Sequence, residues 1–425
     1  MPPAEDWILD SIAQQTQDPI AQIGSADLVI GVLPNREDAN GAALAAVRDA
    51  LKTFSGAVRT VVIQNNGSQG GTSTELQLVD RDSSLMVLSG RIFANPSVAP
   101  LQSISDAYQS VFMLGAKLEA KACCVVASDL KTVTSQWISR LAQPILEMDF
   151  DLVTPCYDRH KLEGLMNSCI ISPLNRALYG RRIENPMGPD LGFSRRVAQR
   201  MVGIESEMKA ARDRPHPLAS LTGTAINAGF QICEAHVGLR LYPSIDWVNV
   251  SSLLAQILGP LFLDMERNAA HWQRIRGSQV VPQFGEPALV SKESGIADVH
   301  RLIESFQLGT RNLLEVWRLV LPTATLFELG KISRLTPERF RIPDELWVRI
   351  VYDFALGHRL RTISRDHLLR AMTPLYLGWV ASYAMESESP GALNVEQRLE
   401  QLAMAYEAAK PYLVSRWRWP DRFNP

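Results

Sequence analysis

Cysteine is scarce in this chain of 425 residues, and its spacing excludes two common uses of the residue. The sequence contains five cysteines, and no two of them form a Cys-x-x-Cys pair. Zinc sites and redox-active pairs both depend on such close spacing. An odd number of scattered thiols in apolar surroundings does not suit a disulfide framework and is typical of a reducing compartment. We therefore expect buried free thiols in a cytoplasmic protein.

Long apolar runs and a surplus of one charge are also missing. No stretch reaches the roughly 18 uninterrupted apolar residues of a membrane-spanning helix. Lys and Arg number 43 and Asp and Glu number 45, which gives a formal net charge of -2. Proteins that bind nucleic acids or anionic membranes usually carry a basic surplus. The N-terminus, MPPAEDWILDS, is acidic and lacks the pattern of a secretory signal. We expect no nucleic-acid partner and no membrane.

Several signatures of enzyme classes are absent from the sequence. It has no P-loop, no Gly-x-Gly-x-x-Gly, and no Ser or Cys nucleophile elbow. Its seven histidines show no metal-binding pair with an acidic third ligand. A functional assignment has to come from other features.

The first half of the chain alternates apolar strands with amphipathic helices. Apolar runs at 27–33, 58–64 and 122–127 predict strands that are covered on both faces. Segments 103–120 and 135–148, before and after the third of these runs, have helical periodicity. Repeated βαβ spacing predicts a mostly parallel sheet with helices on both faces. Ligands of such sheets bind at the carboxyl ends of the strands.

The strand signal fades near residue 250. A polar connector at 276–295 interrupts the helical pattern that follows. We expect two domains, an α/β domain at 1–250 and a mostly helical region at 251–425. The apolar helices of the second region also make a homodimer through that region an expected assembly. Segments with helical periodicity are 251–276, 296–321, 343–358, 365–386 and 395–414.

The most specific stretch is 137–196. It contains a Trp-initiated helix, an Asp-Phe-Asp-Leu-Val strand, an aromatic-x-Arg, a Pro-Leu helix, a Pro-x-Gly-x-acid turn and a Phe-Ser-Arg-Arg. This order resembles the retaining GT-A glycosyltransferases that make glucosyl-3-phosphoglycerate and mannosylglycerate. The segments LPNRE and QNNGSQGGT, and the C-terminal helices, are similar to parts of the same enzymes. The resemblance implies a GT-A fold, which is a Rossmann-like mixed sheet of the nucleotide-diphospho-sugar transferases, followed by a helical extension.

The resemblance also implies an activity. A hexose would pass from a UDP- or GDP-hexose to a small hydroxy acid of the glycerate or 3-phosphoglycerate type. A divalent cation, Mg²⁺ or Mn²⁺, or an equivalent positive charge would stabilise the anionic leaving group. The alternative is a non-catalytic relative, a binding or partner protein that has lost the metal site. The sequence leaves both interpretations open.

The resemblance assigns the nucleotide sugar to loops after three predicted strands. The first loop would contact the base and ribose, the second the base, and the third the ribose and the metal, with Asp129 as metal ligand. The same residues have simpler explanations, because Pro-Asn and Asn-Gly form turns and Asp and Ser cap helices. The assigned donor-binding residues are Pro34, Asn35, Glu37, Asn66, Ser128 and Asp129.

Three further residues are assigned to the acceptor and to catalysis. Arg159 suits a bidentate contact with an acceptor carboxylate, or it pairs with a neighbouring carboxylate at the surface. Gly188 would turn its backbone toward the acceptor, although Pro189 removes one N–H from this turn. Asp190 is the candidate catalytic residue, a carboxylate beside the reacting sugar.

Several positions depart from the family pattern, and the departures share a direction. The nearest match to the family's lysine is Ile104, and the expected metal-ligating histidine is Tyr242. His236 lies six residues before Tyr242, on the same face by strand alternation. An expected acid or amide matches Asn227. These changes remove positive charge or metal ligands from the region of the diphosphate.

Overall fold

The chain forms two compact units, each assembled from several segments. Unit 1 comprises Met1–Asp158, Glu184–Leu241 and Val281–Leu289, and unit 2 comprises Arg159–Ile183, Tyr242–Val280 and Val290–Pro425. The boundary predicted near residue 250 stays a prediction, and residues 159–183 group with the helices of unit 2. The computed structural model describes residues 17–33, 40–65, 77–81, 84–90, 100–126, 133–208, 216–240, 249–287, 298–389 and 393–420.

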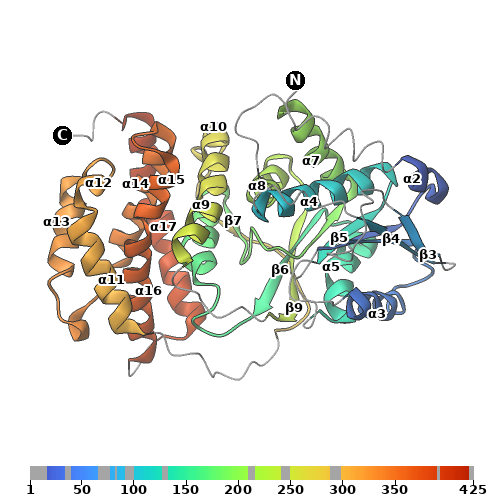
Figure 1. Ribbon diagram of the computed structural model, residues 1–425, viewed down its shortest axis with the longest axis horizontal. Helices are drawn as coiled ribbons and strands as arrows, with labels where there is room; N and C mark the ends of the chain where they lie inside the picture. Colours follow the sequence, from blue (N-terminus) through green and yellow to red (C-terminus); the bar gives the residue numbers. More distant parts are fainter. Residues whose placement is uncertain are drawn as a thin grey trace. The chain divides into compact units, whose positions relative to one another are not determined.

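Unit 1 is built on a nine-stranded sheet in the order β11-β9-β6-β8-β5-β1-β2-β4-β3 (Figure 1). All strands are parallel except β8, which is antiparallel to β5 and β6, and β3, which is antiparallel to β4. The predicted fold class, an α/β domain with a mixed sheet followed by a mostly helical C-terminal region, is confirmed. The bounds are β1 Leu28–Val32, β2 Thr60–Asn65, β3 Gln77–Arg81, β4 Leu85–Gly90, β5 Ala122–Val126, β6 Leu152–Asp158, β8 Leu191–Ser194, β9 Ile232–Leu239 and β11 Gln283–Phe284.

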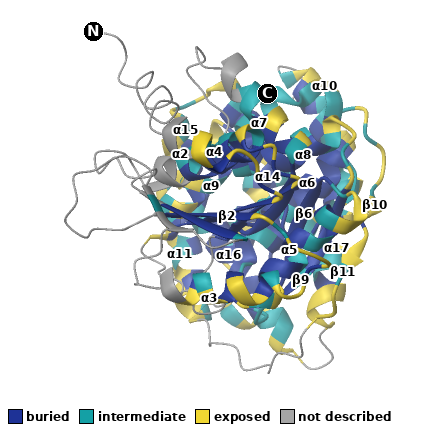
Figure 2. Ribbon diagram, turned by 90° about the vertical axis from the view of Figure 1, so that its right-hand side faces the viewer, coloured by how far each residue is buried: buried dark blue, intermediate teal, exposed yellow. Residues whose placement is uncertain are grey.

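Helices cover both faces of this sheet, which explains the apolar strands. Every residue of β1 and β5 is buried, and Figure 2 shows the middle of the sheet as buried. A Cβ at Gly192 would lie 2.1 Å from the Leu141 carbonyl oxygen, so only glycine lets α5 approach β8. On one face lie α4 Pro100–Lys117, α7 Arg195–Met208 and α8 Pro217–Asn227, and on the other lie α3 Asn40–Leu51 and α5 Ser135–Met148 (Figure 1), while α2 is Gln17–Ile23.

Unit 2 is helical and has an aromatic core. Trp379 stacks on Trp347 with 5.9 Å between ring centroids and on Tyr383 with 5.3 Å. Its helices are α6 Ser172–Tyr179, α9 Val250–Arg267, α10 Ala269–Trp272, α11 Val299–Asn312, α12 Leu314–Arg318, α13 Thr323–Ile332, α14 Asp344–Leu360, α15 Arg365–Ala371, α16 Thr373–Glu388 and α17 Val395–Arg418. A π-helix η1, Asn167–Ile171, a 3-10 helix η2, Pro337–Arg339, and the parallel strands β7 Arg181–Arg182 and β10 Gln279–Val280 complete this unit.

The cysteines behave as their spacing predicts. All five are buried and free, so the expectation of buried thiols is confirmed. Burial raises the pKa of Cys123, Cys124 and Cys156 well above the ordinary range, and their sulfurs therefore stay protonated. Within the described part of the chain, no helix combines the length and the apolar character that crossing a membrane requires.

Candidate functional site

The sheet of unit 1 gathers chemically useful residues at one edge. Strands β6 and β9 are parallel, and their carboxyl ends bring Tyr157 and the residue after β9, Arg240, to this edge. Strand β8 runs in the opposite direction and pairs Leu191 with Val125 of β5. The residue before β8, Asp190, therefore reaches the same edge as the ends of β5 and β6. This is the edge at which ligands of open α/β sheets bind.

The predicted donor residues follow three strands whose ends are described. Strand β1 ends at Val32, β2 at Asn65 and β5 at Val126. The donor assignments remain predictions, as does the role of Tyr242, which is also outside the described residues. The donor residues that lie outside the described residues are Pro34, Asn35, Glu37, Asn66, Ser128 and Asp129.

Asp190 is fully buried and is held by two tyrosine hydroxyls around its turn. The Tyr157 hydroxyl donates to Oδ2 of Asp190 at 2.6 Å, and the Tyr157 hydroxyl oxygen accepts from the Asp190 backbone N–H at 3.3 Å. The Tyr108 hydroxyl donates to the carbonyl oxygen of Pro189. The exposed fraction of Asp190 is 0%. A carboxylate removed from water in this way depends on its hydrogen-bond donors and on nearby positive charge.

Arg240 supplies a positive charge beside the Tyr157–Asp190 pair. Its Cζ lies 4.8 Å from the centroid of the Tyr157 ring, which is the geometry of a cation–π contact. Burial raises the pKa of Tyr157 and of Tyr108 well above the ordinary value, the charge of Asp190 raises both further, and the charge of Arg240 lowers both. Both hydroxyls therefore stay protonated and act as donors. We call Tyr157, Asp190 and Arg240 the edge cluster.

A bulge in β9 sets the direction of Arg240. Cys156 pairs with His236 and Tyr157 pairs with Gly238, so Val237 is an extra residue in β9. Gly238 has a φ of 114°, a region in which glycine is favoured. Bulges of this kind redirect the side chains that follow them. This bulge interrupts the alternation of side chains along β9. The alternation therefore no longer places His236 on the same face as Tyr242.

The turn before Asp190 is packed against β6. The Gly188 N–H donates to the Asn185 carbonyl oxygen at 3.0 Å, so the turn itself uses this N–H. A Cβ at Gly188 would lie 2.5 Å from Cγ of Pro155. The Asn185 side chain donates to the Pro155 carbonyl oxygen at 2.9 Å, and the Thr222 hydroxyl donates to the Pro186 carbonyl oxygen at 2.6 Å. The structure thus gives Gly188 a packing role, and its acceptor role stays a prediction.

Glu234 of β9 is a buried carboxylate that sequence reasoning missed. Its Oε1 accepts from the Glu184 backbone N–H at 2.6 Å, and its Oε2 accepts from Gln283 at 3.1 Å. Burial raises its pKa to about 7. The side chain joins the start of the Glu184–Asp190 segment to β11. Its role is to hold the turn that presents Asp190.

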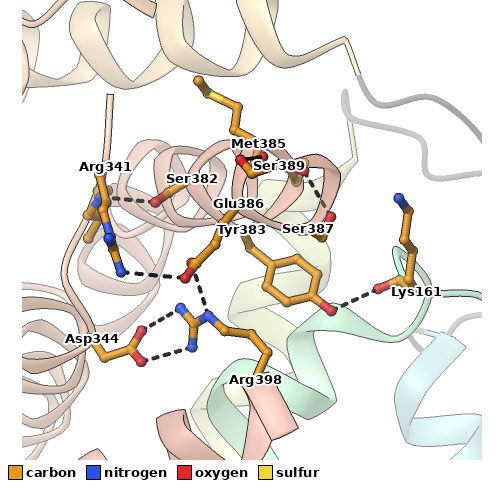
Figure 3. A network of polar contacts seen from close by, with 12 residues as sticks. Lys161, Arg341, Asp344, Ser382, Tyr383, Met385, Glu386, Ser387, Ser389 and Arg398 are labelled. Atoms are coloured by element: carbon orange, nitrogen blue, oxygen red, sulfur yellow. Dashed lines mark hydrogen bonds and ion pairs between the residues drawn. The ribbon is translucent and has the colours of Figure 1, made fainter. Parts of the chain in front are cut away.

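Arg159 belongs to unit 2, where α16 holds the loop that carries it. Its Nη1 donates to the Gly164 carbonyl oxygen at 3.4 Å. The Tyr383 hydroxyl donates to the carbonyl oxygen of Lys161 in the same loop at 3.3 Å, as Figure 3 shows. The positive charge of Arg159 lowers the pKa of Tyr383, although burial raises that pKa overall. The acceptor role of Arg159 stays a prediction.

An ion-pair network around the buried side chain of Arg398 stabilises the helices around Tyr383 (Figure 3). Arg398 of α17 donates two hydrogen bonds of 2.8 Å to the carboxylate of Asp344 in α14. Its Nε donates to Glu386 of α16 at 3.0 Å, and Arg341 contacts the other oxygen of Glu386 at 3.4 Å. A bidentate Arg–carboxylate pair is geometrically specific. The network therefore fixes three helices of unit 2 together.

The described residues do not supply a metal centre. Among them, no three His, Cys, Asp or Glu side chains are grouped so that they could hold a metal ion. Asp190 accepts its hydrogen bond from Tyr157. The expected Mg²⁺ or Mn²⁺ thus depends on Asp129, outside the described residues. The divalent metal remains a prediction.

Comparison with known proteins gives matches among solved structures. Glucosyl-3-phosphoglycerate synthase from Mycobacterium tuberculosis, solved with Mn²⁺, UDP-glucose and phosphoglyceric acid, is 16% identical with a TM-score of 0.37, and the match covers 61% of this chain and 84% of that chain. A structure described as a mycobacterial protein is 18% identical with a TM-score of 0.38 over 60% of this chain and 78% of that chain. No family model and no curated protein matches the sequence. Identities and TM-scores of this size identify neither an activity nor a substrate.

Sequence reasoning named Asp190 but missed its two partners. Tyr157 is the aromatic residue of the aromatic-x-Arg motif that drew attention to Arg159. Arg240 is the arginine of a Gly-x-Arg that we used only to locate Tyr242. Both signals were present, but only the sheet order brings β6, β8 and β9 together.

Proposed function

We propose that the protein is a glycosyltransferase that moves a hexose from a nucleoside diphosphate sugar to a small hydroxy-acid acceptor of the glycerate or 3-phosphoglycerate type. The edge cluster is the reacting end of the site. The donor lies over the carboxyl ends of β1, β2 and β5. The residues assigned to the donor come within a few positions after these strands in the sequence. Arg159 is the residue that we propose for binding the acceptor carboxylate, as the resemblance implies.

The single observation that carries this proposal is the buried carboxylate of Asp190 at the ligand-binding edge of the sheet. A structural carboxylate can be satisfied anywhere in a fold. Asp190 instead directly precedes β8, between the carboxyl ends of β5 and β6, at the edge of the sheet where ligands of such folds bind. It is also the residue that the family resemblance assigns to the sugar.

The chemistry requires charge of both signs. The bond between the anomeric carbon and the diphosphate oxygen breaks, and its electron pair leaves on the diphosphate. A new bond forms from the acceptor hydroxyl to the anomeric carbon, and the hydroxyl proton passes to the departing diphosphate. The carboxylate of Asp190 stabilises the positive charge that develops on the sugar ring, and its hydrogen bond from Tyr157 holds it in place before the reaction begins.

The alternative function is a glycosyltransferase-like binding or partner protein. It is favoured by the replacement of expected charged or metal-ligating positions with Ile104 and Tyr242. Such a protein would bind a nucleotide sugar, or a partner chain, without transferring a hexose.

The test separates these functions. UDP- and GDP-hexoses are titrated into the protein by calorimetry, with Mg²⁺, Mn²⁺ or EDTA, and product formation with glycerate and 3-phosphoglycerate is followed by mass spectrometry. Transfer that falls by about 100-fold or more in Asp190→Asn, with donor affinity retained, supports the enzyme. Donor binding without any transfer supports the alternative. No binding of any nucleotide sugar contradicts both.

A further inference from the structure

One guanidinium stands at the edge of the sheet for which the resemblance implies a metal. Arg240 follows β9 directly, and its backbone N–H donates to the Asp158 carbonyl oxygen at 3.1 Å, so the main chain is still held against β6. Its side chain is half-buried and lies over the Tyr157 ring at 4.8 Å. The backbone hydrogen bond to Asp158 and the contact with the Tyr157 ring together fix the position of the Arg240 guanidinium.

We propose that Arg240 binds the diphosphate of the nucleotide and that this chain holds its donor without a divalent metal. The inference rests on the proposed function and names the group that replaces the cation. A guanidinium presents five N–H donors in a planar fork that matches two phosphate oxygens. Stacking on Tyr157 uses the face of this plane, whereas hydrogen bonding to phosphate uses its edge.

The sequence around Arg240 agrees with a replacement of this kind. The expected metal-ligating histidine is Tyr242, two residues after Arg240. A phenol at this position removes one metal ligand of the family pattern. The positive charge of Arg240 reaches the same edge from the same stretch of chain. A diphosphate needs positive charge there whichever group supplies it.

A simpler explanation is that Arg240 only neutralises Asp190. The charges of both residues act on the hydroxyls of Tyr108 and Tyr157, so the two charges lie close to one tyrosine pair. This explanation predicts that loss of the guanidinium lowers stability and leaves nucleotide affinity unchanged. The two explanations therefore differ in a measurable quantity.

Arg196 provides a matched control. Its Nε and Nη2 donate to the buried carboxylate of Asp151 at 2.9 and 2.7 Å. Asp151 precedes β6, so this pair lies at the opposite edge of the same sheet. Arg196→Gln removes an arginine from a buried carboxylate in unit 1 without touching the carboxyl ends of the strands.

The experiment is calorimetry of UDP and GDP in EDTA with the full chain and three variants. We expect wild-type protein and Arg196→Gln to bind one nucleotide equally. Arg240→Gln should bind it about 10- to 100-fold more weakly, which is the range for losing hydrogen bonds to a charged group. The nucleotide affinity of Arg240→Lys should lie between those of the wild type and Arg240→Gln, because lysine keeps the positive charge and lacks the planar set of N–H donors. If Arg240→Gln does not fold, as judged by near-UV circular dichroism, Arg240→Lys decides the question.

Three results overturn the inference. Equal nucleotide affinity in wild type and Arg240→Gln would make the arginine a counter-ion only. Binding that disappears in EDTA and returns with Mn²⁺ would show that a metal holds the diphosphate, and the proposed function would survive. Absence of nucleotide binding under every condition would remove the inference together with the proposed function.

Discussion

The hydroxyl of Tyr157 lies 2.6 Å from Oδ2 of Asp190, and both side chains are buried at the same edge of the sheet. Tyr157→Phe removes this donor and keeps the ring, which still packs against Trp137 at 5.7 Å between centroids. We expect the free energy of unfolding to fall by about 1–3 kcal/mol, because a buried carboxylate loses a hydrogen bond. Hexose transfer should fall as well, because the carboxylate is no longer oriented.

Tyr352→Phe is the matched control for that change. The Tyr352 hydroxyl donates to the Tyr406 carbonyl oxygen at 2.7 Å within unit 2. Urea denaturation should report a stability loss in both variants, whereas a rate assay should report a loss of transfer in Tyr157→Phe only. Equal transfer by both variants would contradict a positioning role for Tyr157.

Gly188→Ala should destabilise unit 1 through sterics alone. The added Cβ would lie 2.5 and 2.7 Å from Cγ and Cδ of Pro155, and a proline ring within a strand has little freedom to move. We expect a loss of about 1–3 kcal/mol, as is usual for overpacking, in chemical denaturation.

Gly203→Ala is the control for Gly188→Ala. Gly203 lies within α7, and a Cβ there meets no atom within 4 Å. Alanine should stabilise this helix by about 0.5–1 kcal/mol. Similar effects of the two substitutions would argue that Gly188 is not constrained by Pro155.

Glu234 should make stability depend on pH in a defined direction. Burial raises its pKa to about 7, from an ordinary value near 4.5, and Glu184 and Cys156 face it. Between about pH 4.5 and 7 the folded protein keeps a proton that the unfolded chain has lost, so this contribution is complete below pH 4.5 and is lost as the pH rises. The slope is at most about 1.4 kcal/mol per pH unit.

Glu234→Gln isolates that contribution, since glutamine does not titrate. Unfolding free energies from urea titrations at several pH values should show the wild type losing stability relative to the variant as the pH rises from about 4.5 to 7. Burial also raises the pKa of Asp264 and Asp353 to about 7, but both residues titrate in both proteins and cancel in the difference. A difference that does not change with pH would contradict the prediction.

Arg398→Met should strongly destabilise unit 2. It leaves the carboxylates of Asp344 and Glu386 without the guanidinium that contacts both. We expect a loss of up to about 3 kcal/mol, because two partly buried carboxylates have lost the buried guanidinium that pairs with them. Tryptophan fluorescence during urea denaturation measures it, since Trp347 and Trp379 of this unit are buried.

Arg370→Met is the comparison within the same unit. Arg370 pairs with Asp366 at 2.7 Å in an exposed i,i+4 arrangement. Solvent screens such a pair, so the denaturation midpoint should not change. Equal effects of the two substitutions would mean that the Arg398 network does not stabilise unit 2.

Local patterns account for the elements that the sequence predicts well. Strands β1 and β5 are buried on both faces, so consecutive residues in each of them are apolar. The sequence shows this as an uninterrupted apolar run. Helix α5 begins after Thr134, whose side chain accepts from the Trp137 N–H at 3.3 Å. A local signal fails at 365–386, where α15 ends at Ala371 and α16 begins at Thr373, with Pro374 in the first turn of α16.

Long-range pairing accounts for what the sequence does not predict. Strand β8 has four residues, and nothing within them indicates that they run antiparallel between β5 and β6. Strand β11 has two residues within a stretch that the sequence describes as a connector. The extra residue in β9 becomes visible only when Cys156 and Tyr157 are matched to their partners.

The sequence by itself determined the alternation of strands and helices and the buried free thiols, because burial and turn chemistry act between neighbours along the chain. The candidacy of Asp190 came from the family resemblance of the stretch that contains it. Only the tertiary structure decided that Tyr157 contacts Asp190 and that Arg240 lies over the Tyr157 ring. These three residues come from β6, the end of β9 and the start of β8, and the order of strands in a sheet depends on packing between segments that are far apart in the sequence.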